Sequence, residues 1–303
     1  MIIRLLPAIL AGLFLAACAT SPAATPTPTD WASQGARDLV PIVVSSDLAT
    51  GQNRFLINVV DRQNQPLGSA DRAAKLNFYD LAANNTSPAV TADGTYMVVL
   101  SRLPGLYRAM VDFPHAGQWG LELTLTDADG TQRSGRLGFP VRETSTTPAI
   151  GAQAPATVTP TATIADGIHE ISTDSAPDPD FYTTSVKQAL DEHKPFMLVF
   201  ATPAFCRTQT CGPALDVVKS VAADYKDKVT FIHVEPYKLQ MTEGQLQPVF
   251  NGTDLVPVQP TLDWGLPTEP YAFVVDADGK VTAKFEGIAG PDELRAALDQ
   301  VAK

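Results

Sequence analysis

The stretch PFMLVFATPAFCRTQTCGPALDVVKSVAADY, residues 195–225, decides the fold of the second half of this chain. Its residues 196–200 are apolar throughout, which is typical of a buried central strand. Pro213 suits the first turn of a helix, where its missing N–H group costs nothing. Apolar residues then recur at helical spacing: Leu215, Val218, Ala222 and Tyr225. We therefore predict a strand that ends before Cys206 and a helix that begins near Cys211.

Cys206 and Cys211 are the only cysteines outside the N-terminal segment. A thiol at a helix N-terminus feels the positive end of the helix dipole, which favours the reactive thiolate form. In an oxidising compartment such a pair forms a disulfide, and loop entropy gives so short a ring only about 2 kcal/mol of stability. The pair is therefore the candidate catalytic site, with a structural disulfide as the alternative.

The N-terminal segment carries a targeting signal. Arg4 is followed by an apolar stretch, residues 5–17, that is too short to span a bilayer reliably, so we predict a signal peptide over residues 1–17. The end of this stretch, Leu15-Ala16-Ala17-Cys18, resembles the lipobox of bacterial lipoproteins. That resemblance implies lipidation of Cys18 and anchoring on the extracytoplasmic side of a bacterial membrane, in the cell envelope. A plain signal peptide and an N-terminal anchor are the alternatives.

Length and composition predict two domains and narrow the range of partners. The chain has 303 residues and a formal net charge of −11, and no basic patch stands out, which argues against nucleic acid as a partner. Residues 18–37 are rich in Ala, Pro, Thr and Ser, and we predict a flexible tether. Residues 143–180 contain no Lys or Arg, and we predict a linker that is disordered or draped on a surface. These boundaries leave domains at residues 38–142 and 181–303.

The first domain is predicted to be all-β. Seven candidate strands lie at fairly even spacing: 40–45, 55–61, 75–80, 95–100, 105–113, 120–127 and 135–141. Turn signals separate them at 65–66, 92–94, 103–105 and 127–130. This arrangement suggests an immunoglobulin-like sandwich, with Tyr107, Phe113 and Trp119 in its core.

The second domain is predicted to be α/β. A helix within 182–193 precedes parallel strands at 196–202 and 229–235, which need a right-handed crossover. A long connection follows, with a short helix expected over 242–250. A hairpin over 271–286 and a helix striped by Leu294, Ala297, Leu298 and Val301 complete the order.

This order, with a cysteine pair after the first central strand, resembles the thioredoxin fold over residues 182–303. It is most similar to membrane-tethered extracytoplasmic thiol-disulfide oxidoreductases of the TlpA/ResA type. The motifs that carry the resemblance are VFATPAFC…CGP (199–213), AADYKDKVTFIHVE (222–235), TEPY (268–271) and AFVVDADGKVTAKFEG (272–287). The resemblance implies thiol exchange with protein thiols or disulfides, with Cys206 and Cys211 catalytic and with no cofactor or metal.

The spacing of the cysteines departs from the family, because four residues separate them here instead of two. We favour Cys206 as nucleophile and Cys211 as resolving cysteine, and the reverse stays open because Cys211 is nearer the helix. The resemblance implies that Pro270, rather than Pro267, is the cis-proline that faces the cysteines and lets the preceding backbone pair with substrate. The residue before it is Glu269, whose carboxylate would raise the pKa of nearby thiols.

Other residues are candidate modulators. Arg207 beside Cys206 would favour its thiolate, and Pro213 belongs to the start of the helix. Glu235 ends the second strand near the same rim, where a family carboxylate relays protons. His233, on the same strand, is predicted to be a core histidine. The alternative functions are a non-catalytic binding or scaffold lipoprotein with a permanent disulfide, and copper handling, for which no convincing third ligand is found.

Overall fold

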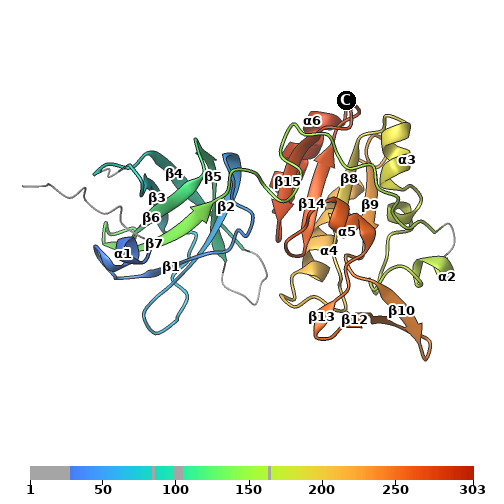
Figure 1. The fold of residues 1–303 in the computed structure, drawn as a ribbon, viewed down its shortest axis with the longest axis horizontal. Coiled ribbons are helices and arrows are strands. Elements are labelled where there is room, and N and C mark those ends of the chain that lie inside the picture. The colour runs from blue at the N-terminus through green and yellow to red at the C-terminus, as the bar shows by residue number, and fades with distance from the viewer. Residues whose placement is uncertain (1–27, 84–85, 99–104, 163–164) are drawn as a thin grey trace, which may run out of the picture.

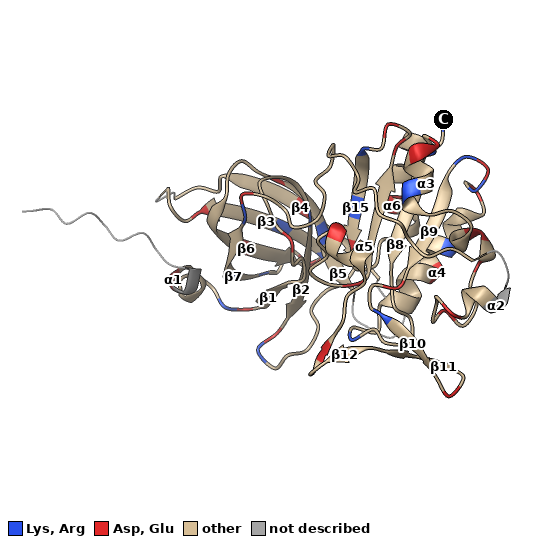
Figure 2. Cartoon of the chain, turned by 45° about the vertical axis from the view of Figure 1, so that its right-hand side comes forward, with Lys and Arg blue, Asp and Glu red and all other residues tan. Residues whose placement is uncertain are grey.

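The computed structural model describes residues 28–83, 86–98, 105–162 and 165–303. The predicted signal peptide, Cys18 and the first part of the predicted tether lie outside these residues. Within them, no helix is both long enough and apolar enough to cross a membrane. The described chain forms a β-rich N-terminal domain and an α/β C-terminal domain, which lie side by side (Figure 1). Acidic and basic residues are interspersed over both domains (Figure 2).

The N-terminal domain is one antiparallel sheet in the order β1-β2-β5-β4-β3-β6-β7. The strands are β1 (Val40–Val43), β2 (Gly51–Val60), β3 (Ala73–Asp80), β4 (Val90–Met97), β5 (Leu106–Phe113), β6 (Gly117–Thr126) and β7 (Gln132–Val141). The sheet is nearly closed, because the N–H groups of Asp38 and Leu39, just before β1, donate to the carbonyl of Ser134 in β7. The all-β prediction is confirmed, and an immunoglobulin-like relationship stays a prediction.

One predicted turn is wrong: residues 92–94 lie inside strand β4. This strand pairs with β3 through residues 90–94 and with β5 through 95–97, so it joins the two halves of the sheet. Gly94 faces Ala74, where an added Cβ atom would lie 3.0 Å from the alanine Cβ. The glycine is therefore explained by close packing of strands rather than by a turn.

An aromatic core fills the N-terminal domain. Phe78 contacts Phe55, Phe113 and Phe139 edge to face, and all but Phe139 are fully buried. Tyr107, Phe113 and Trp119 are in this core as predicted. Part of the predicted flexible tether forms a short helix. Its helix α1 (Pro28–Ser33) places Trp31 against Tyr79, with the Arg136 guanidinium 4.3 Å from the centre of an indole ring. Burial of that one large side chain explains why this end of the tether docks.

The C-terminal domain has a four-stranded sheet in the order β15-β14-β8-β9. Strands β8 (Phe196–Phe200) and β9 (Thr230–Val234) are parallel, as predicted, and β14 (Tyr271–Val275) and β15 (Val281–Glu286) form the hairpin. Helices α4 (Cys211–Ala222) and α6 (Pro291–Val301) pack on one face through Met197 and Val199. Helix α3 (Val186–Asp191) and Trp264, which follows helix α5 (Gln259–Asp263), cover the other face. Every residue of β8 is buried, so this strand fixes the position of the loop that follows it.

The connection between β9 and β14 differs from the prediction. No helix forms over 242–250; strands β10 (Leu239–Thr242) and β11 (Gln245–Pro248) make a hairpin instead. Its turn residues Glu243 and Gly244 have φ values of 52° and 79°, the left-handed conformation that two-residue hairpin turns require. Two short strands follow, β12 (Phe250–Asn251) and β13 (Asp254–Leu255).

The described residues of the linker 143–180 pack on the surface of the C-terminal domain, which is the second of the two arrangements that the sequence predicts. Ala154 donates its N–H to the carbonyl of Gly279, and Thr157, Thr159 and Ser172 are buried. Helix α2 (Ala165–Ile168) lies in this segment, and the 3₁₀ turn η1 (Pro179–Tyr182) begins at its end. Backbone hydrogen bonds to the C-terminal domain and small buried side chains hold it, which its polar composition did not suggest.

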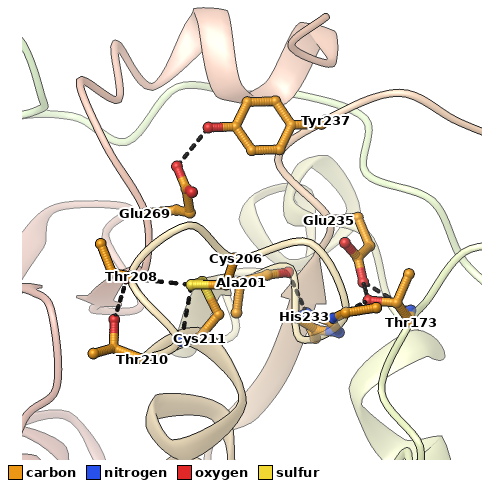
Figure 3. Close-up of a disulfide and its surroundings, with 11 residues drawn as sticks. Thr173, Ala201, Cys206, Thr208, Thr210, Cys211, His233, Glu235, Tyr237 and Glu269 are labelled. Atoms are coloured by element: carbon orange, nitrogen blue, oxygen red, sulfur yellow. Dashed lines mark hydrogen bonds between the residues drawn. A yellow bond between two sulfur atoms is a disulfide. The ribbon is translucent and has the colours of Figure 1, made fainter. Parts of the chain in front are cut away.

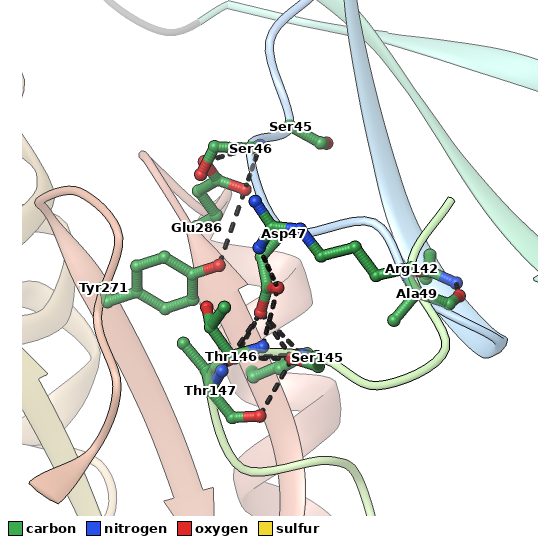
Figure 4. Close-up of polar contacts among 12 residues, drawn as sticks. Ser45, Ser46, Asp47, Ala49, Arg142, Ser145, Thr146, Thr147, Tyr271 and Glu286 are labelled. Atoms are coloured by element: carbon green, nitrogen blue, oxygen red, sulfur yellow. Dashed lines mark hydrogen bonds and ion pairs between the residues drawn. The ribbon is translucent and has the colours of Figure 1, made fainter. Parts of the chain in front are cut away.

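Polar contacts join the two domains. Arg54 of β2 pairs with both carboxylate oxygens of Glu293 at 2.9 and 3.0 Å, and it donates to the carbonyls of Glu286 and Ile288. A second group of contacts includes Ser46, which donates its N–H to the Glu286 carboxylate at 2.9 Å (Figure 4). These contacts involve buried or half-buried charges, so the domains are held in a defined relation.

Asp47 is the centre of that second group. Its carboxylate accepts hydrogen bonds from the hydroxyl of Ser145 and from the backbone and side chain of Thr147, and it lies near the ammonium group of Lys284. Burial alone would raise the pKa of Asp47, but these hydrogen bonds, with that of the Thr146 N–H, outweigh burial and lower the pKa to about 2. The carboxylate therefore stays charged at the junction of both domains and the linker.

Candidate functional site

The candidate site lies in the loop that connects strand β8 to helix α4. The loop 201–210 leaves the carboxyl end of β8 and returns the chain to Cys211, the first residue of α4. Cys206 and Cys211 form a disulfide, with their Cα atoms 5.9 Å apart (Figure 3). That separation is usual for disulfides. The loop with four intervening residues thus brings the two sulfurs together.

The two cysteines differ in exposure and in contacts. Cys211 is fully buried against the helix core, whereas Cys206 is partly exposed. The backbone N–H of Cys211 donates to the Cys206 sulfur at 3.2 Å, and the Thr208 hydroxyl lies 3.3 Å from the same sulfur. A free N–H group at the start of a helix carries the positive end of the helix dipole. The helix N-terminus is therefore directed at the sulfur of Cys206, although Cys211 is the residue within the helix.

The peptide bond between Glu269 and Pro270 is cis. It is the bond for which the sequence predicts this geometry, in preference to Pro267. Glu269 is brought to the cysteines: one of its carboxylate oxygens and the two sulfurs lie within 4.8 Å of one another. The site therefore combines a disulfide at a helix N-terminus with a cis-proline and a neighbouring carboxylate.

A comparison with protein families places the domain that carries this site. Residues 182–302 match the family model of the thioredoxin-like domain. Residues 182–302 therefore form a thioredoxin-like domain. The match does not extend to the β-rich domain, and no curated protein matches the chain. The predicted fold of the C-terminal domain is confirmed, whereas its assignment to the TlpA/ResA type stays a prediction.

Glu269 is held by a residue that the sequence analysis missed. Glu269 is 7 % exposed, and the hydroxyl of Tyr237 donates to its Oε2 atom at 2.5 Å. Burial is the main cause that raises the pKa of Tyr237, and the hydrogen bond to Glu269 raises it further. The hydroxyl therefore remains a neutral donor. Tyr237 comes from the connection after β9, and no motif links it to Glu269 in the sequence.

Of the predicted modulators, Arg207 and Pro213 lie where the sequence places them. Arg207 is exposed beside Cys206, and its charge acts on Tyr237 by lowering the pKa of that hydroxyl against the larger raising effects. Pro213 is half-buried in the first turn of α4. Neither residue contacts the sulfurs through a hydrogen bond in the described structure.

Glu235 is buried, and it is connected to the cysteine loop rather than to the sulfurs. It is 6 % exposed and accepts from the N–H and the hydroxyl of Thr173 at 2.7 and 2.6 Å. The same hydroxyl of Thr173 accepts the N–H of Ala204 at 3.1 Å, two residues before Cys206. Thr173 belongs to the linker, so the draped segment takes part in positioning the loop. No motif in the sequence indicates this contact.

His233 is the core histidine that the sequence predicts. Its ring nitrogens pair with the hydroxyl of Tyr182 at 2.8 Å and the carbonyl of Ala201 at 2.9 Å. Burial lowers its pKa, against a raising effect of Glu235, which keeps the ring neutral. Through Ala201 it supports the start of the cysteine loop.

The site also faces the N-terminal domain, which the sequence did not predict. A cavity of about 180 Å³ lies beside the loop, lined by Thr208, Thr210 and Pro270 of the thioredoxin-like domain. Val44, Leu56 and Leu106 of the β-rich domain form its opposite wall. The cavity is mostly apolar, and the cis-proline and the cysteine loop both open onto it.

Proposed function

We propose that the chain is a thiol-disulfide oxidoreductase, or the redox partner of one, that acts on protein thiols and disulfides through Cys206 and Cys211. One observation carries this proposal. The partly exposed sulfur of Cys206 accepts an N–H bond from the helix N-terminus while it is bonded to the fully buried Cys211. A sulfur so placed is the better thiolate and the more accessible one. The same observation supports Cys206 as the attacking thiol.

The exchange proceeds in two steps that conserve electrons. In the reduced protein, the Cys206 thiolate attacks a substrate disulfide, forms a mixed disulfide and releases one substrate thiolate. The Cys211 thiolate then attacks the Cys206 sulfur, which closes the Cys206–Cys211 disulfide and releases the second substrate thiolate. Two electrons pass to the substrate, and the reverse sequence oxidises a substrate dithiol. The cis-proline loop at Glu269 and Pro270 supplies the backbone edge next to which the substrate chain lies.

The setting of this activity is also proposed. The sequence Leu15-Ala16-Ala17-Cys18 supports lipidation of Cys18 and tethering on the extracytoplasmic side of a bacterial membrane. The same setting would make the chain an enzyme of the TlpA/ResA type. The β-rich domain, proposed to be immunoglobulin-like, would act as a docking module, since Val44, Leu56 and Leu106 wall the cavity beside the cysteine loop.

Thiol trapping of the purified full chain across a glutathione series tests the proposal. We expect the Cys206–Cys211 pair to open at a potential above about −300 mV, because structural disulfides of secreted proteins lie below that value. With a model disulfide substrate, Cys211→Ser should accumulate a mixed disulfide at Cys206, whereas Cys206→Ser should not.

Two results would contradict it. A pair that stays closed under mild reductant would favour the scaffold function, in which the disulfide is permanent. A mixed disulfide trapped only by Cys206→Ser would instead assign the attack to Cys211 and reverse the proposed order of the two thiols.

A further inference from the structure

Beside the two sulfurs lies a carboxylate that thiol exchange does not use. Glu269 is 7 % exposed, and its oxygen and the two cysteine sulfurs lie within 4.8 Å of one another. Among the described residues no Lys or Arg forms an ion pair with Glu269, and its one hydrogen bond comes from Tyr237. A buried carboxylate costs free energy unless a charge compensates it. We propose that the reduced protein binds one zinc-class divalent cation through Cys206, Cys211 and Glu269.

The spacing of the donor atoms suits such an ion. Ligand atoms around a tetrahedral zinc, with bonds of about 2.0–2.3 Å, lie about 3.3–3.8 Å apart. The disulfide holds the sulfurs closer than this, and reduction frees them to separate. Zinc sites commonly use two cysteines with two to four residues between them, and four residues lie between Cys206 and Cys211. The spacing that departs from thioredoxins is therefore within the range of zinc ligands.

The donor set selects the class of metal. Two thiolates alone suit soft ions such as copper(I), whereas a carboxylate oxygen added to them suits zinc, which accepts both sulfur and oxygen ligands. Tyr237 donates to Oε2 of Glu269 and so fixes the orientation of the carboxylate, as outer hydrogen bonds do at metal sites. Three protein ligands leave a fourth position for water.

Binding is coupled to the redox state of the pair. A dithiol reductant supplies two electrons and two protons, which convert the disulfide to two thiols, and the reductant becomes a disulfide. The cation then binds both sulfurs as thiolates and displaces the two thiol protons into solvent. Oxidation to the disulfide removes both sulfur ligands and releases the ion. The inference goes beyond the proposed exchange, and it shares with that function only the requirement that the pair be reducible.

The test titrates the full chain with Co²⁺ as a spectroscopic probe and then with Zn²⁺ against a chromogenic chelator. The reduced protein should bind one equivalent with sulfur-to-cobalt charge-transfer bands, and the oxidised protein should bind none. Glu269→Gln should weaken binding at least about tenfold, and Tyr237→Phe should weaken it about 10–100-fold. Glu243→Gln changes an exposed glutamate on the β10–β11 turn and should leave the affinity unchanged.

Two outcomes overturn the inference. One is a reduced wild-type protein, with both thiols titrated, that binds no stoichiometric metal. The other is a Glu269→Gln variant that binds as tightly as the wild type, which would leave only a simple dithiol chelate. Thiol trapping of the same samples reports whether the pair opens, so a failure of metal binding is distinguished from a failure of redox exchange. Formation of the disulfide by the oxidised variants checks that they fold.

Discussion

Both domains have a hydrophobic core, and they differ in whether a disulfide accompanies it. The β-rich domain has no cysteine, and aromatic side chains that are almost fully buried fill its nearly closed sheet. The thioredoxin-like domain also has a hydrophobic core, on both faces of its sheet, and its one disulfide lies in the loop that follows strand β8. The difference indicates that burial supports both folds and that the disulfide serves the site. Four predictions test this division, from the largest expected effect to the smallest.

The aromatic core should dominate the stability of the β-rich domain. Phe78 is fully buried and contacts three other aromatic rings, so Phe78→Ala removes both burial and ring contacts. We expect a loss of about 3–5 kcal/mol in the free energy of unfolding, measured by urea denaturation. Met110→Ala is the control, because Met110 is 52 % exposed on a strand of the same sheet. Equal effects of the two variants would show that the ring cluster is not the core.

The ion pair between Arg54 and Glu293, which joins the domains, should have the next largest effect on stability. Burial alone would raise the pKa of Glu293, but its pairing with Arg54 holds the pKa below the usual value. Removing one partner of a buried ion pair costs about 3–5 kcal/mol, and here we expect the low end because Arg108 still pairs with Glu293. We expect Arg54→Ala to separate the unfolding of the domains into two transitions by calorimetry.

A matched control distinguishes burial from charge in that result. Lys75→Ala removes an ion pair with Asp93 that is exposed on both sides, so it should change stability little. If Lys75→Ala were as disruptive as Arg54→Ala, the domain interface would have no special role, and the N-terminal domain would not be held beside the cysteine loop.

Some of the elements behind these predictions could be predicted from the sequence, and others could not. Strand β8 is predictable because a run of only five apolar residues, flanked by Pro195 and Pro203, favours a buried strand over a helix. The turn expected at 92–94 is wrong because Gly94 is needed for close packing of strands. A glycine in the sequence is equally compatible with a turn and with a tightly packed strand. The helix expected over 242–250 failed because the left-handed turn at Glu243 and Gly244 favours a hairpin. Local patterns therefore gave most elements and missed those in which one residue type has two structural uses.

The candidate site shows the same limit over longer distances. Cys206, Cys211 and Pro270 follow from motifs near strands, since a strand end and a helix start fix where they lie. Tyr237, which binds Glu269, and Thr173, which binds Glu235, come from irregular segments far away in the chain. No periodicity constrains such segments. Their positions depend on how the connection and the linker pack, which only the folded chain defines.

Asp47 gives the interface a predictable response to acid. Its pKa falls from 3.8 to about 2 in the folded protein, so the charged carboxylate stabilises the fold above pH 3.8, and this contribution is lost as the pH falls through about 2. The shift corresponds to about 2 kcal/mol. We expect the difference in unfolding free energy between wild type and Asp47→Asn to be constant above about pH 5 and to shrink by that amount towards pH 2.

Denaturant unfolding at a series of pH values measures this difference. Asp254→Asn serves as the control, because Asp254 is exposed on strand β13. A difference for Asp47→Asn that does not change with pH would mean that the variant acts by losing hydrogen bonds alone, and that the charge on Asp47 does not stabilise the junction with Lys284.

The smallest effect on stability is expected at the cysteines, where the effect on function is expected to be complete. Reduction of so short a ring removes only about 2 kcal/mol of loop entropy, and the buried strand β8 and helix α4 remain packed without it. Urea denaturation with and without a dithiol should therefore show a modest shift and two folded domains. The Cys206→Ser/Cys211→Ser variant should not respond to the reductant. Unfolding of the thioredoxin-like domain on reduction would mean that the disulfide holds the fold, and the division between a core that stabilises and a disulfide that reacts would be lost.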